Sequence, residues 1–422
     1  MTKTIYYDIS ELFYLSSGEK EYYGIAKVVF EGARWLAHSQ YDAKFVVFSQ
    51  PHGAFFEITP LFDENHPGGV DFPIPNAGKI KFTRRTYHQR SAFLRHATPL
   101  FALIDKVQRR IWAKSGVPFE PLDVRGGAFV SCARPKLLVP IIEHLRDKEC
   151  SIHILWHDLI PLYDYTKGKD AAFRSNFYFD SCVLFEASDQ LIANSHATAA
   201  DIEKFWGLGE LPKVGALTVA QLAHALSPSS GAPKVTPPDG PYFLMVGTTL
   251  GRKNLNVVLD AMRFLATRGA RIAPLVLAGQ RRKRTAKKLA EAEYQAIAAS
   301  VIEISNPPQR DLTHLYENAT AVILPSFLEG WGLPAAEGLW SGVPAICAET
   351  DVLREVCGDA GIYFDPNAPE ALAAILERLI EDPAYLAERK AAVTARRAEL
   401  RTWDDFGHDL FKALDPFLDI AG

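Results

Sequence analysis

The chain has 422 residues, of which 48% are hydrophobic and 23% are charged, and its formal net charge is -4. At about 150 residues per domain, this length suggests two or three domains with their own cores. The composition excludes a disordered, collagen-like or small disulfide-stapled protein. No stretch approaches the ~18 uninterrupted apolar residues of a membrane span, and the N-terminus lacks the apolar core of a signal peptide. The acidic balance argues against nucleic acid as a partner.

The five cysteines are scattered along the chain, and no C-x-x-C spacing occurs. This pattern favours reduced, mostly buried thiols, so we expect a cytoplasmic protein. The cysteines are Cys132, Cys150, Cys182, Cys347 and Cys357.

Short apolar runs alternate with amphipathic segments, which is the pattern of parallel sheets flanked by helices. In the first half, helices are predicted at 25–38 and 197–206. Strands are predicted there at 4–10, 43–49, 128–132, 151–156 and 190–194. The segment 226–241 has five prolines and no periodicity, which is typical of an interdomain linker.

The same alternation restarts in the second half, where the apolar runs are rich in Val, Ile and Leu, as in strands covered on both faces. Strands are predicted at 242–247, 274–279, 301–305, 321–325, 344–347 and 361–364. We therefore expect two doubly wound, Rossmann-like α/β domains that face each other across a cleft, with ligands at the carboxyl ends of the strands. The predicted parts are a first Rossmann-like domain at 1–228, a linker at 229–241, a second Rossmann-like domain at 242–400 and a helix at 401–422 that packs back on the first domain.

Several nucleotide-binding and metal-binding motifs are missing from the sequence. No G-x-G-x-x-G follows a predicted strand and no P-loop occurs, which counts against a dehydrogenase or an NTPase. H-E-x-x-H and G-x-S-x-G are missing as well, so no dedicated metal site and no nucleophile elbow are predicted. Phosphate binding then has to come from helix N-termini and isolated basic side chains.

The most informative stretch is 325–347, PSFLEGWGLPAAEGLWSGVPAIC, which follows a predicted strand. Gly330 and Gly332 free the backbone ahead of a predicted helix, whose N-terminus can then receive a phosphate. Two carboxylates, Glu329 and Glu337, bracket this helix start. Taken alone, either carboxylate is better explained by a tight strand-to-helix connection in which Glu337 complements the helix dipole.

The sequence EGWGLPAAE resembles the E-x7-E motif of retaining glycosyltransferases with the GT-B fold, specifically glycosyltransferase family 4 of the bacterial polysaccharide type. Other segments resemble the same family in the expected order. They are 157–162 (HDLIPL), 190–202, 242–262 (with Gly-x-x-x-x-Arg-Lys-Asn), 274–279, 310–326 and 350–366. The likeness covers nearly the whole chain, and such an ordered set is far more specific than one E-x7-E. It implies that the domain at 1–228 binds the acceptor and that the domain at 242–400 binds the nucleotide sugar.

The resemblance implies roles for four side chains of the second half. It implies that Glu329 holds hydroxyls of the donor sugar and that Glu337 holds the ribose hydroxyls. Arg252 and Lys253 would neutralise the donor diphosphate, because pre-placed cations stabilise a departing nucleoside diphosphate without a metal. Without this context the two cations are better explained as a solvated pair near a helix start. The implied donor-binding set is Gly24, Arg252, Lys253, Glu329, Gly330, Gly332, Leu333 and Glu337.

In the first half, His157 follows a predicted strand and matches a histidine that the family places beside the reacting sugar. A lone histidine at such a position is more often structural, and only the resemblance reverses this. Asn194 and Ser195 either border the same site or, for Ser195, cap the next helix. The implied catalytic set is His157, Glu329, Arg252 and Lys253, with no metal ligand.

The turn at Gly24 resembles the family's glycine-rich turn into the first helix, with two departures. Tyr23 stands where the family has a second glycine, and Lys27 stands where it often has an arginine. These changes leave open how closely the turn approaches the phosphates and the acceptor.

Residues 79–114 contain ten Lys or Arg, five aromatic residues and only one acid, Asp105. Such a segment fits an anionic membrane surface, where each cation contributes roughly 1 kcal/mol. The alternative is a solvated helical face that lines an acceptor groove. A second basic cluster at 281–288 is better explained as a solvated helix start.

We therefore expect a cytoplasmic hexosyltransferase, peripheral on the inner face of the membrane. It would move a sugar from a nucleotide-sugar donor, with GDP-mannose the first choice, to a lipid-linked saccharide in surface polysaccharide synthesis. No carboxylate nucleophile is evident, so the family's front-face retaining substitution is expected, with no metal or other cofactor. The alternative is a catalytically silent scaffold that binds nucleotide sugar or membrane, which the altered turn at 23–25 leaves open.

Overall fold

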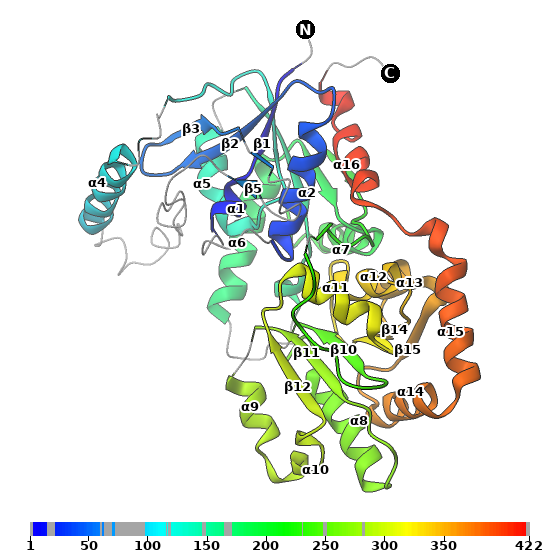
Figure 1. Cartoon of the computed structure of the whole chain (residues 1–422). Coiled ribbons are helices and arrows are strands. Elements are labelled where there is room, and N and C mark those ends of the chain that lie inside the picture. Colours follow the sequence, from blue (N-terminus) through cyan, green and yellow to red (C-terminus); the bar gives the residue numbers. More distant parts are fainter. Residues whose placement is uncertain are drawn as a thin grey trace. The chain divides into compact units, whose positions relative to one another are not determined.

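The structure is a computed structural model that describes residues 3–14, 22–59, 61–62, 70–71, 98–114, 116, 120–145, 149–163, 171–229, 231–247, 251–280 and 283–418. The chain divides into two compact α/β units (Figure 1). The first unit is Met1–Leu222 together with Trp403–Gly422, and the second is Ala223–Thr402. The predicted linker at 229–241 and the domain boundaries predicted on either side of it stay predictions.

The first unit is built on a sheet that has seven strands within the described ranges, in the order β3-β2-β1-β6-β7-β8-β9. Neighbouring strands pair in parallel except β2 and β3 at one edge. The strands are β1 (Ile5–Asp8), β2 (Ala43–Ser49), β3 (Ala54–Glu57), β6 (Ala128–Ser131), β7 (Ser151–Trp156), β8 (Gln190–Ala193) and β9 (Ala216–Val219). The five strands predicted for this half are confirmed. β3 and β9 were not predicted, and both lie at sheet edges.

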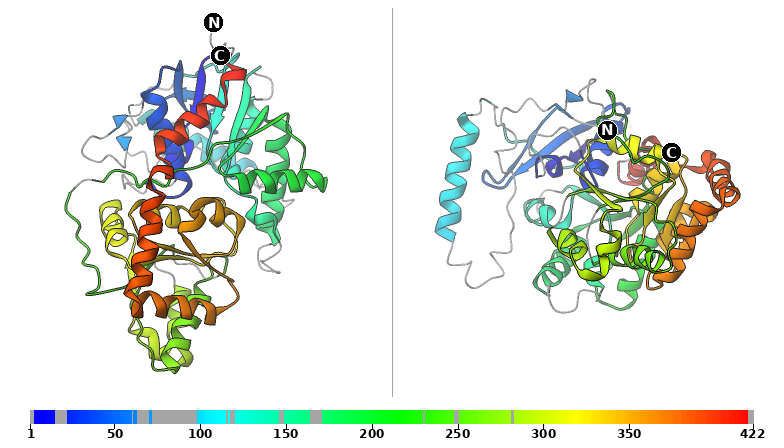
Figure 2. Two further views of the ribbon diagram at one scale, coloured as in Figure 1. Left: turned by 90° about the vertical axis from the view of Figure 1, so that its right-hand side faces the viewer. Right: turned by 60° about the horizontal axis from the view of Figure 1, so that its bottom comes forward.

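The helices of the first unit follow the predicted periodicity where it was strong. Those at 25–38 and 197–206 are confirmed to within a residue or two. The α-helices of this unit are α1 (Ser10–Tyr14), α2 (Ile25–Ala37), α4 (Thr98–Lys114), α5 (Pro135–Leu145), α6 (Ala171–Ala187), α7 (His196–Gly207) and α16 (Trp403–Lys412). The last of these comes from the far end of the chain and lies along α2 (Figure 2). Trp35 and Phe411 stack there with ring centroids 5.4 Å apart.

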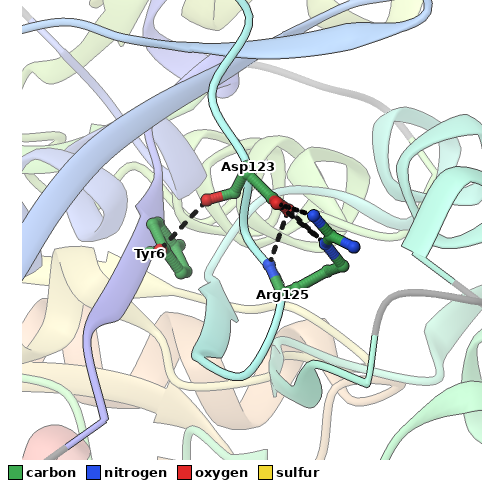
Figure 3. Close-up of polar contacts among 3 residues, drawn as sticks. All are labelled: Tyr6, Asp123 and Arg125. Carbon is green, nitrogen blue, oxygen red and sulfur yellow. Dashed lines mark hydrogen bonds and ion pairs between the residues drawn. The ribbon is translucent and has the colours of Figure 1, made fainter.

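A turn at the amino-terminal ends of the strands leads into β6 (Figure 3). The Asp123 carboxylate accepts hydrogen bonds from the backbone nitrogen of Arg125 at 3.1 Å and from its Nε at 2.7 Å. The Tyr6 hydroxyl donates to the Asp123 carbonyl oxygen at 3.2 Å. A Cβ on Gly127 would lie 2.7 Å from the backbone oxygen of Thr4, so only glycine allows β1 and β6 to approach here. This end of the sheet is opposite to the carboxyl ends, where ligands bind in such folds.

The second unit has an all-parallel sheet of six strands among the residues described, in the order β12-β11-β10-β13-β14-β15. The strands are β10 (Phe243–Val246), β11 (Leu275–Gly279), β12 (Val301–Ser305), β13 (Ala321–Leu324), β14 (Ala345–Ala348) and β15 (Gly361–Phe364). All six predicted strands are confirmed. The helices are α8 (Leu255–Thr267), α9 (Lys283–Leu289), α10 (Gln295–Ala298), α11 (Gln309–Asn318), α12 (Leu333–Trp340), α13 (Asp351–Cys357), α14 (Pro369–Glu381) and α15 (Pro383–Ala395).

Helices cover both faces of this sheet, which is why its strands read as continuous apolar runs. On one face Phe243 and Ile323 belong to a buried cluster with residues of α8 and α14. On the other face Leu244 and Val322 pack with Leu315 of α11. The strand order reverses between β10 and β13, and this topological switch point is where open α/β sheets bind ligands.

All five cysteines are free, and four of them are buried. The Cys347 and Cys357 sulfur atoms lie 3.7 Å apart. No helix in the described ranges is both long and apolar enough to cross a bilayer.

Candidate functional site

The second unit contains all the predicted donor-binding residues except Gly24, which belongs to the first unit. Arg252 and Lys253 lie in the connection from β10 to α8, and Glu329 lies in the connection from β13 to α12. The two loops meet through the backbone, because the Phe327 nitrogen donates to the Arg252 carbonyl oxygen at 3.0 Å. The fold therefore brings together residues that are 76 positions apart in the sequence.

Glu329 is held between two cations. Its Oε1 lies 2.7 Å from the Lys253 Nζ, and its Oε2 lies 3.0 Å from an Arg252 Nη. The Arg252 guanidinium also donates to the Leu328 carbonyl oxygen at 2.7 Å, which fixes its direction. The exposed fractions of the side chains are 9% for Glu329, 16% for Lys253 and 31% for Arg252, so the cations are more exposed to solvent than the carboxylate.

Charge keeps Glu329 ionised. Burial by itself would raise the pKa of this carboxyl, but the neighbouring Lys253 and Arg252 outweigh burial and lower the pKa to about 2. At neutral pH the three side chains therefore carry one net positive charge. The two fixed cations after β10, beside the loop that follows β13, form a site that can attract a diphosphate.

Helix α12 starts directly after this loop, as the sequence predicts. Gly332 caps the helix with a φ of 100°, in the left-handed region that favours glycine. A Cβ at this position would also lie 2.7 Å from a methyl carbon of Leu353. Gly330 and Gly332 are buried, and Leu333 begins the helix, so the first amides of α12 lie beside the Glu329 loop.

Glu337 is on the buried side of α12 and is 5% exposed. Its Oε2 accepts a hydrogen bond of 2.8 Å from the Tyr316 hydroxyl of α11. Burial, followed by the adjacent Glu337 charge, raises the pKa of Tyr316, so the phenol keeps its proton and remains a donor. Tyr316 is a residue of this site that the sequence analysis missed, and no sequence pattern points to it.

The first unit has a cavity of about 420 Å³ at its own switch point, between β1 and β6. Predicted site residues Gly24 and His157 line it. The other lining residues are Tyr23, Ile25, Arg134, Pro135, Lys136, Leu155, Trp156, Asp158, Pro161, Phe177 and Asp180. A concave, largely apolar wall with a few charged groups is typical of a small-molecule site.

His157 enters this cavity from the end of β7 with a defined tautomer. Its Nε2 lies 2.7 Å from the Cys132 carbonyl oxygen, which can only accept a hydrogen bond. Burial lowers the pKa of His157 to about 4, against the opposing effect of the Cys132 hydrogen bond. The ring is therefore neutral near pH 7, with the proton on Nε2, which leaves Nδ1 as a hydrogen-bond acceptor.

The cavity holds cations that the sequence analysis did not single out. Arg134 and Lys136 flank the start of α5, directly after β6. The Arg134 Nε donates to Glu11 at 2.8 Å, and Glu11 is fully buried. Burial raises the pKa of Glu11, which Arg134 opposes. Residues that follow β1 and β6 thus position each other, and the Arg-Pro-Lys run after a predicted strand was the available signal.

The turn at Gly24 also belongs to this cavity. Gly24 has a φ of 59° and precedes α2, so its backbone needs glycine even though a Cβ there would meet no atom within 4 Å. Tyr23, the departure from the family pattern, is 42% exposed and lines the cavity. Lys27 is buried, and its Nζ lies 5.3 Å from the ring centroid of Trp403.

For Ser195, the structure decides between a place at the border of the site and a role as a helix cap. Its Oγ accepts a hydrogen bond of 2.9 Å from the Thr198 nitrogen and caps α7. Neither residue lines the cavity beside His157.

Part of the basic segment 79–114 falls outside the described residues, namely 79–97, and so do Arg281 and Arg282 of the second basic cluster. The rest of the basic segment forms α4. Among the described residues, no group of three or more His, Cys, Asp or Glu side chains could hold a metal ion.

Solved structures share the fold of this chain. Sucrose-phosphate synthase from Thermosynechococcus elongatus aligns with a TM-score of 0.65 and 15% identity, and the alignment covers 99% of each chain. Anabaena Alr3699/HepE, in a complex with UDP, aligns with a TM-score of 0.51 and 15% identity over 68% of this chain and 78% of that one. The chain has the GT-B fold of two Rossmann-like domains, as the sequence predicted.

Sequence comparisons match part of the chain to a family. Residues 231–398 match the family described as Glycosyl transferases group 1. O-antigen chain mannosyltransferase B of Escherichia coli is 32% identical over 167 residues, which is 39% of this chain and 43% of that protein. Serotype-specific mannosyltransferase WbdA of Escherichia coli is 25% identical over 262 residues, which is 60% of this chain and 32% of that protein. These matches support a group 1 glycosyltransferase, and they span less than half the length of these two relatives.

Proposed function

We propose that the chain is a retaining glycosyltransferase that binds the diphosphate of a nucleotide sugar at the carboxyl ends of β10 and β13. The observation that carries this proposal is the charge cluster of Arg252, Lys253 and Glu329, with its distances of 2.7 and 3.0 Å. Its single net positive charge suits an anion, and α12 begins at Leu333, at the end of the loop that holds Glu329, so its N-terminus adds a favourable dipole. The fixed cations supply the charge stabilisation that a metal gives in other enzymes, so we expect transfer without an added metal.

In the proposed reaction, the bond between the sugar's anomeric carbon and the diphosphate oxygen breaks, and a bond from an acceptor hydroxyl oxygen to that carbon forms. The hydroxyl proton passes to the departing phosphate oxygen, so atoms and charges balance. Arg252 and Lys253 stabilise the negative charge that builds on the nucleoside diphosphate. Glu329, ionised at neutral pH, accepts hydrogen bonds from hydroxyls of the donor sugar, and Glu337 with Tyr316 holds the ribose.

The acceptor is proposed to enter the cavity of the first unit. His157 offers Nδ1 as a hydrogen-bond acceptor for a sugar hydroxyl, because its Nε2 proton is engaged by Cys132. Trp156 and Phe177 give the cavity an aromatic wall, and Arg134 and Lys136 add positive charge. These features favour a saccharide that carries an anionic group, as a lipid-linked saccharide does through its phosphate.

The relatives support mannose as the sugar, since the two named above are mannosyltransferases. We therefore propose GDP-mannose as donor and a lipid-linked saccharide of surface polysaccharide synthesis as acceptor, in the cytoplasm, which the five free cysteines favour. A catalytically silent scaffold of the same fold is the alternative, and the intact charge cluster counts against it.

Incubation of the purified protein with GDP-mannose or UDP-sugars and a lipid-linked saccharide tests the proposal. The expected product carries one added sugar with the anomeric configuration of the donor, seen by mass spectrometry and proton NMR. An inverted anomer would overturn the retaining mechanism. Nucleotide binding without any transfer to a panel of lipid-linked acceptors would favour the scaffold.

A further inference from the structure

Helix α4 presents an apolar stripe to solvent. Five large hydrophobic side chains of this one helix are 36% to 57% exposed, more than any other element of the described chain contributes. They are Leu100, Leu103, Ile104, Val107 and Ile111. At the helical period these positions share a sector of about 100°, which is the width of the core-facing stripe of an ordinary amphipathic helix. Here that stripe faces outward.

The opposite side of α4 holds the helix to the first unit. Trp112 is 3% exposed and packs edge-to-face on Phe56 of β3 with ring centroids 4.4 Å apart. Arg109 donates a hydrogen bond of 2.8 Å to the Pro51 carbonyl oxygen. Figure 1 shows α4 beside β3 at the margin of the unit. These contacts fix the rotation of the helix about its axis. The apolar stripe therefore points away from the first unit.

Positive charge borders the stripe. Lys106, Arg110 and Lys114 are exposed and lie along one margin of it at the helical period. The helix has a single carboxylate, Asp105, which is half-buried and lies on the docked side. Exposed apolar residues beside cations, with acids kept away, complement the acyl chains and anionic headgroups of a bilayer. A second copy of the chain would instead present the same cations.

The helix is suited to lie in a membrane interface and not to cross the bilayer. It has 17 residues, and four of them are Lys or Arg. We propose that the exposed stripe of α4 inserts into the headgroup region of an anionic lipid bilayer, with Lys106, Arg110 and Lys114 on the lipid phosphates. The bilayer is then a partner of the proposed transferase. The membrane proposal rests on the proposed function only for the link to a lipid-linked acceptor.

Flotation of the full chain with vesicles tests the surface. Vesicles of phosphatidylcholine with about one part in three phosphatidylglycerol are compared with vesicles of phosphatidylcholine alone. The variant L103E/V107E should lower the bound fraction at least about tenfold, because two charges then enter the stripe. The matched control is L208E, since Leu208 is 60% exposed at the end of α7, away from the stripe. R110Q/K114Q should weaken binding less and reduce its dependence on salt.

Three results would overturn the inference: no binding of the unchanged chain to anionic vesicles, equal binding of L103E/V107E, or an equal loss in L208E. A dimer that L103E/V107E converts to monomer without lipid would assign the stripe to self-association instead. GDP binding is measured on the same samples. Retained GDP binding without vesicle binding overturns this inference alone, whereas vesicle binding without any nucleotide binding supports the surface and overturns the proposed function.

Discussion

The two units place their candidate sites at equivalent positions but build them differently. In the second unit, Lys253 and Arg252 hold the Glu329 carboxylate ionised in a partly buried charge cluster. In the first unit, His157 is a neutral ring in a cavity of about 420 Å³. One site is organised by charge and the other by shape and hydrogen bonding. This difference matches a donor that carries a diphosphate and an acceptor that presents a hydroxyl.

The contrast also assigns different sensitivities to the two sites. A change of charge in the second unit should alter anion binding and turnover strongly, whereas changes in the first unit should act mainly on the acceptor. Substitutions in each unit therefore test this contrast.

The largest effect is expected for Glu329. We expect E329Q to lower turnover by at least about 1000-fold, because a preorganised carboxylate for the sugar is lost. The same change leaves two unneutralised cations, so affinity for GDP should hold or rise. Steady-state transfer and GDP titration measure the two quantities, and near-normal turnover would contradict the assignment. D260N, a change of an acid on α8 that is part of neither site, is the matched control.

A smaller effect is expected for His157. H157Q keeps a hydrogen-bond donor for Cys132 but loses the acceptor nitrogen, so transfer should fall by about 10- to 100-fold, mainly through KM for the acceptor. GDP binding to the second unit should not change. A loss of GDP affinity as large as the loss of transfer would contradict the separation of the two sites.

The same variant tests the pKa of His157. Because the pKa is lowered from about 6.5 in the unfolded chain to about 4 in the fold, the unfolded state takes up the proton first. Stability is therefore lost as the pH falls from about 6.5 to about 4, and it levels off below that. Urea denaturation across this window should show a shallower loss for H157Q. Burial also lowers the pKa of His224, in the second unit, to about 4. H224Q is therefore a positive control, which should show a shallower loss of stability for the same reason.

Gly332 should affect both stability and donor binding in the second unit. G332A is expected to cost about 1–3 kcal/mol, since φ is 100° and the added Cβ would meet Leu353. Denaturation measures the cost, and GDP affinity should fall with it because the first amides of α12 shift. G342A, at a glycine with a φ of 78° and an open surround, controls for backbone strain alone. Equal losses in both would show that the contact with Leu353 is unimportant.

The smallest effect is expected at the turn in Figure 3. Asp123 and Arg125 are more than half exposed, and the turn is at the amino-terminal ends of the strands. R125A should leave the melting temperature and the transfer rate unchanged within error, because exposed ion pairs contribute little. A clear loss of activity in R125A would mean that the opposite end of the sheet takes part in the site.

The second unit could be predicted from the sequence more completely than the first. The loop and helix that carry Glu329 and Glu337 are contiguous, and each buried parallel strand there gives a continuous apolar run. In the first unit, Arg134 lines the cavity and is held by Glu11. The two residues are 123 positions apart and meet only because β1 and β6 pair in parallel. No local pattern contains that pairing.

The elements missed by the sequence analysis have a similar cause. β9 is half-buried along its whole length at a sheet edge, so its apolar signal is weak. β3 pairs antiparallel at the other edge, outside the alternation of strands and helices on which the prediction relied. The bond from Tyr316 to Glu337 joins two helices, and the sequence carries no sign of it.

The most direct test of the account is GDP and UDP binding in EDTA, measured by calorimetry for the unchanged chain and for K253M. Lys288 supplies the matched control K288M, since it is also a lysine of the second unit paired to a carboxylate, at 2.9 Å from Glu291. The account predicts metal-free binding of one of the two nucleotides, weakened at least about tenfold in K253M and unchanged in K288M. Binding that requires a divalent metal, or that K253M leaves intact, would contradict a donor site built on fixed cations.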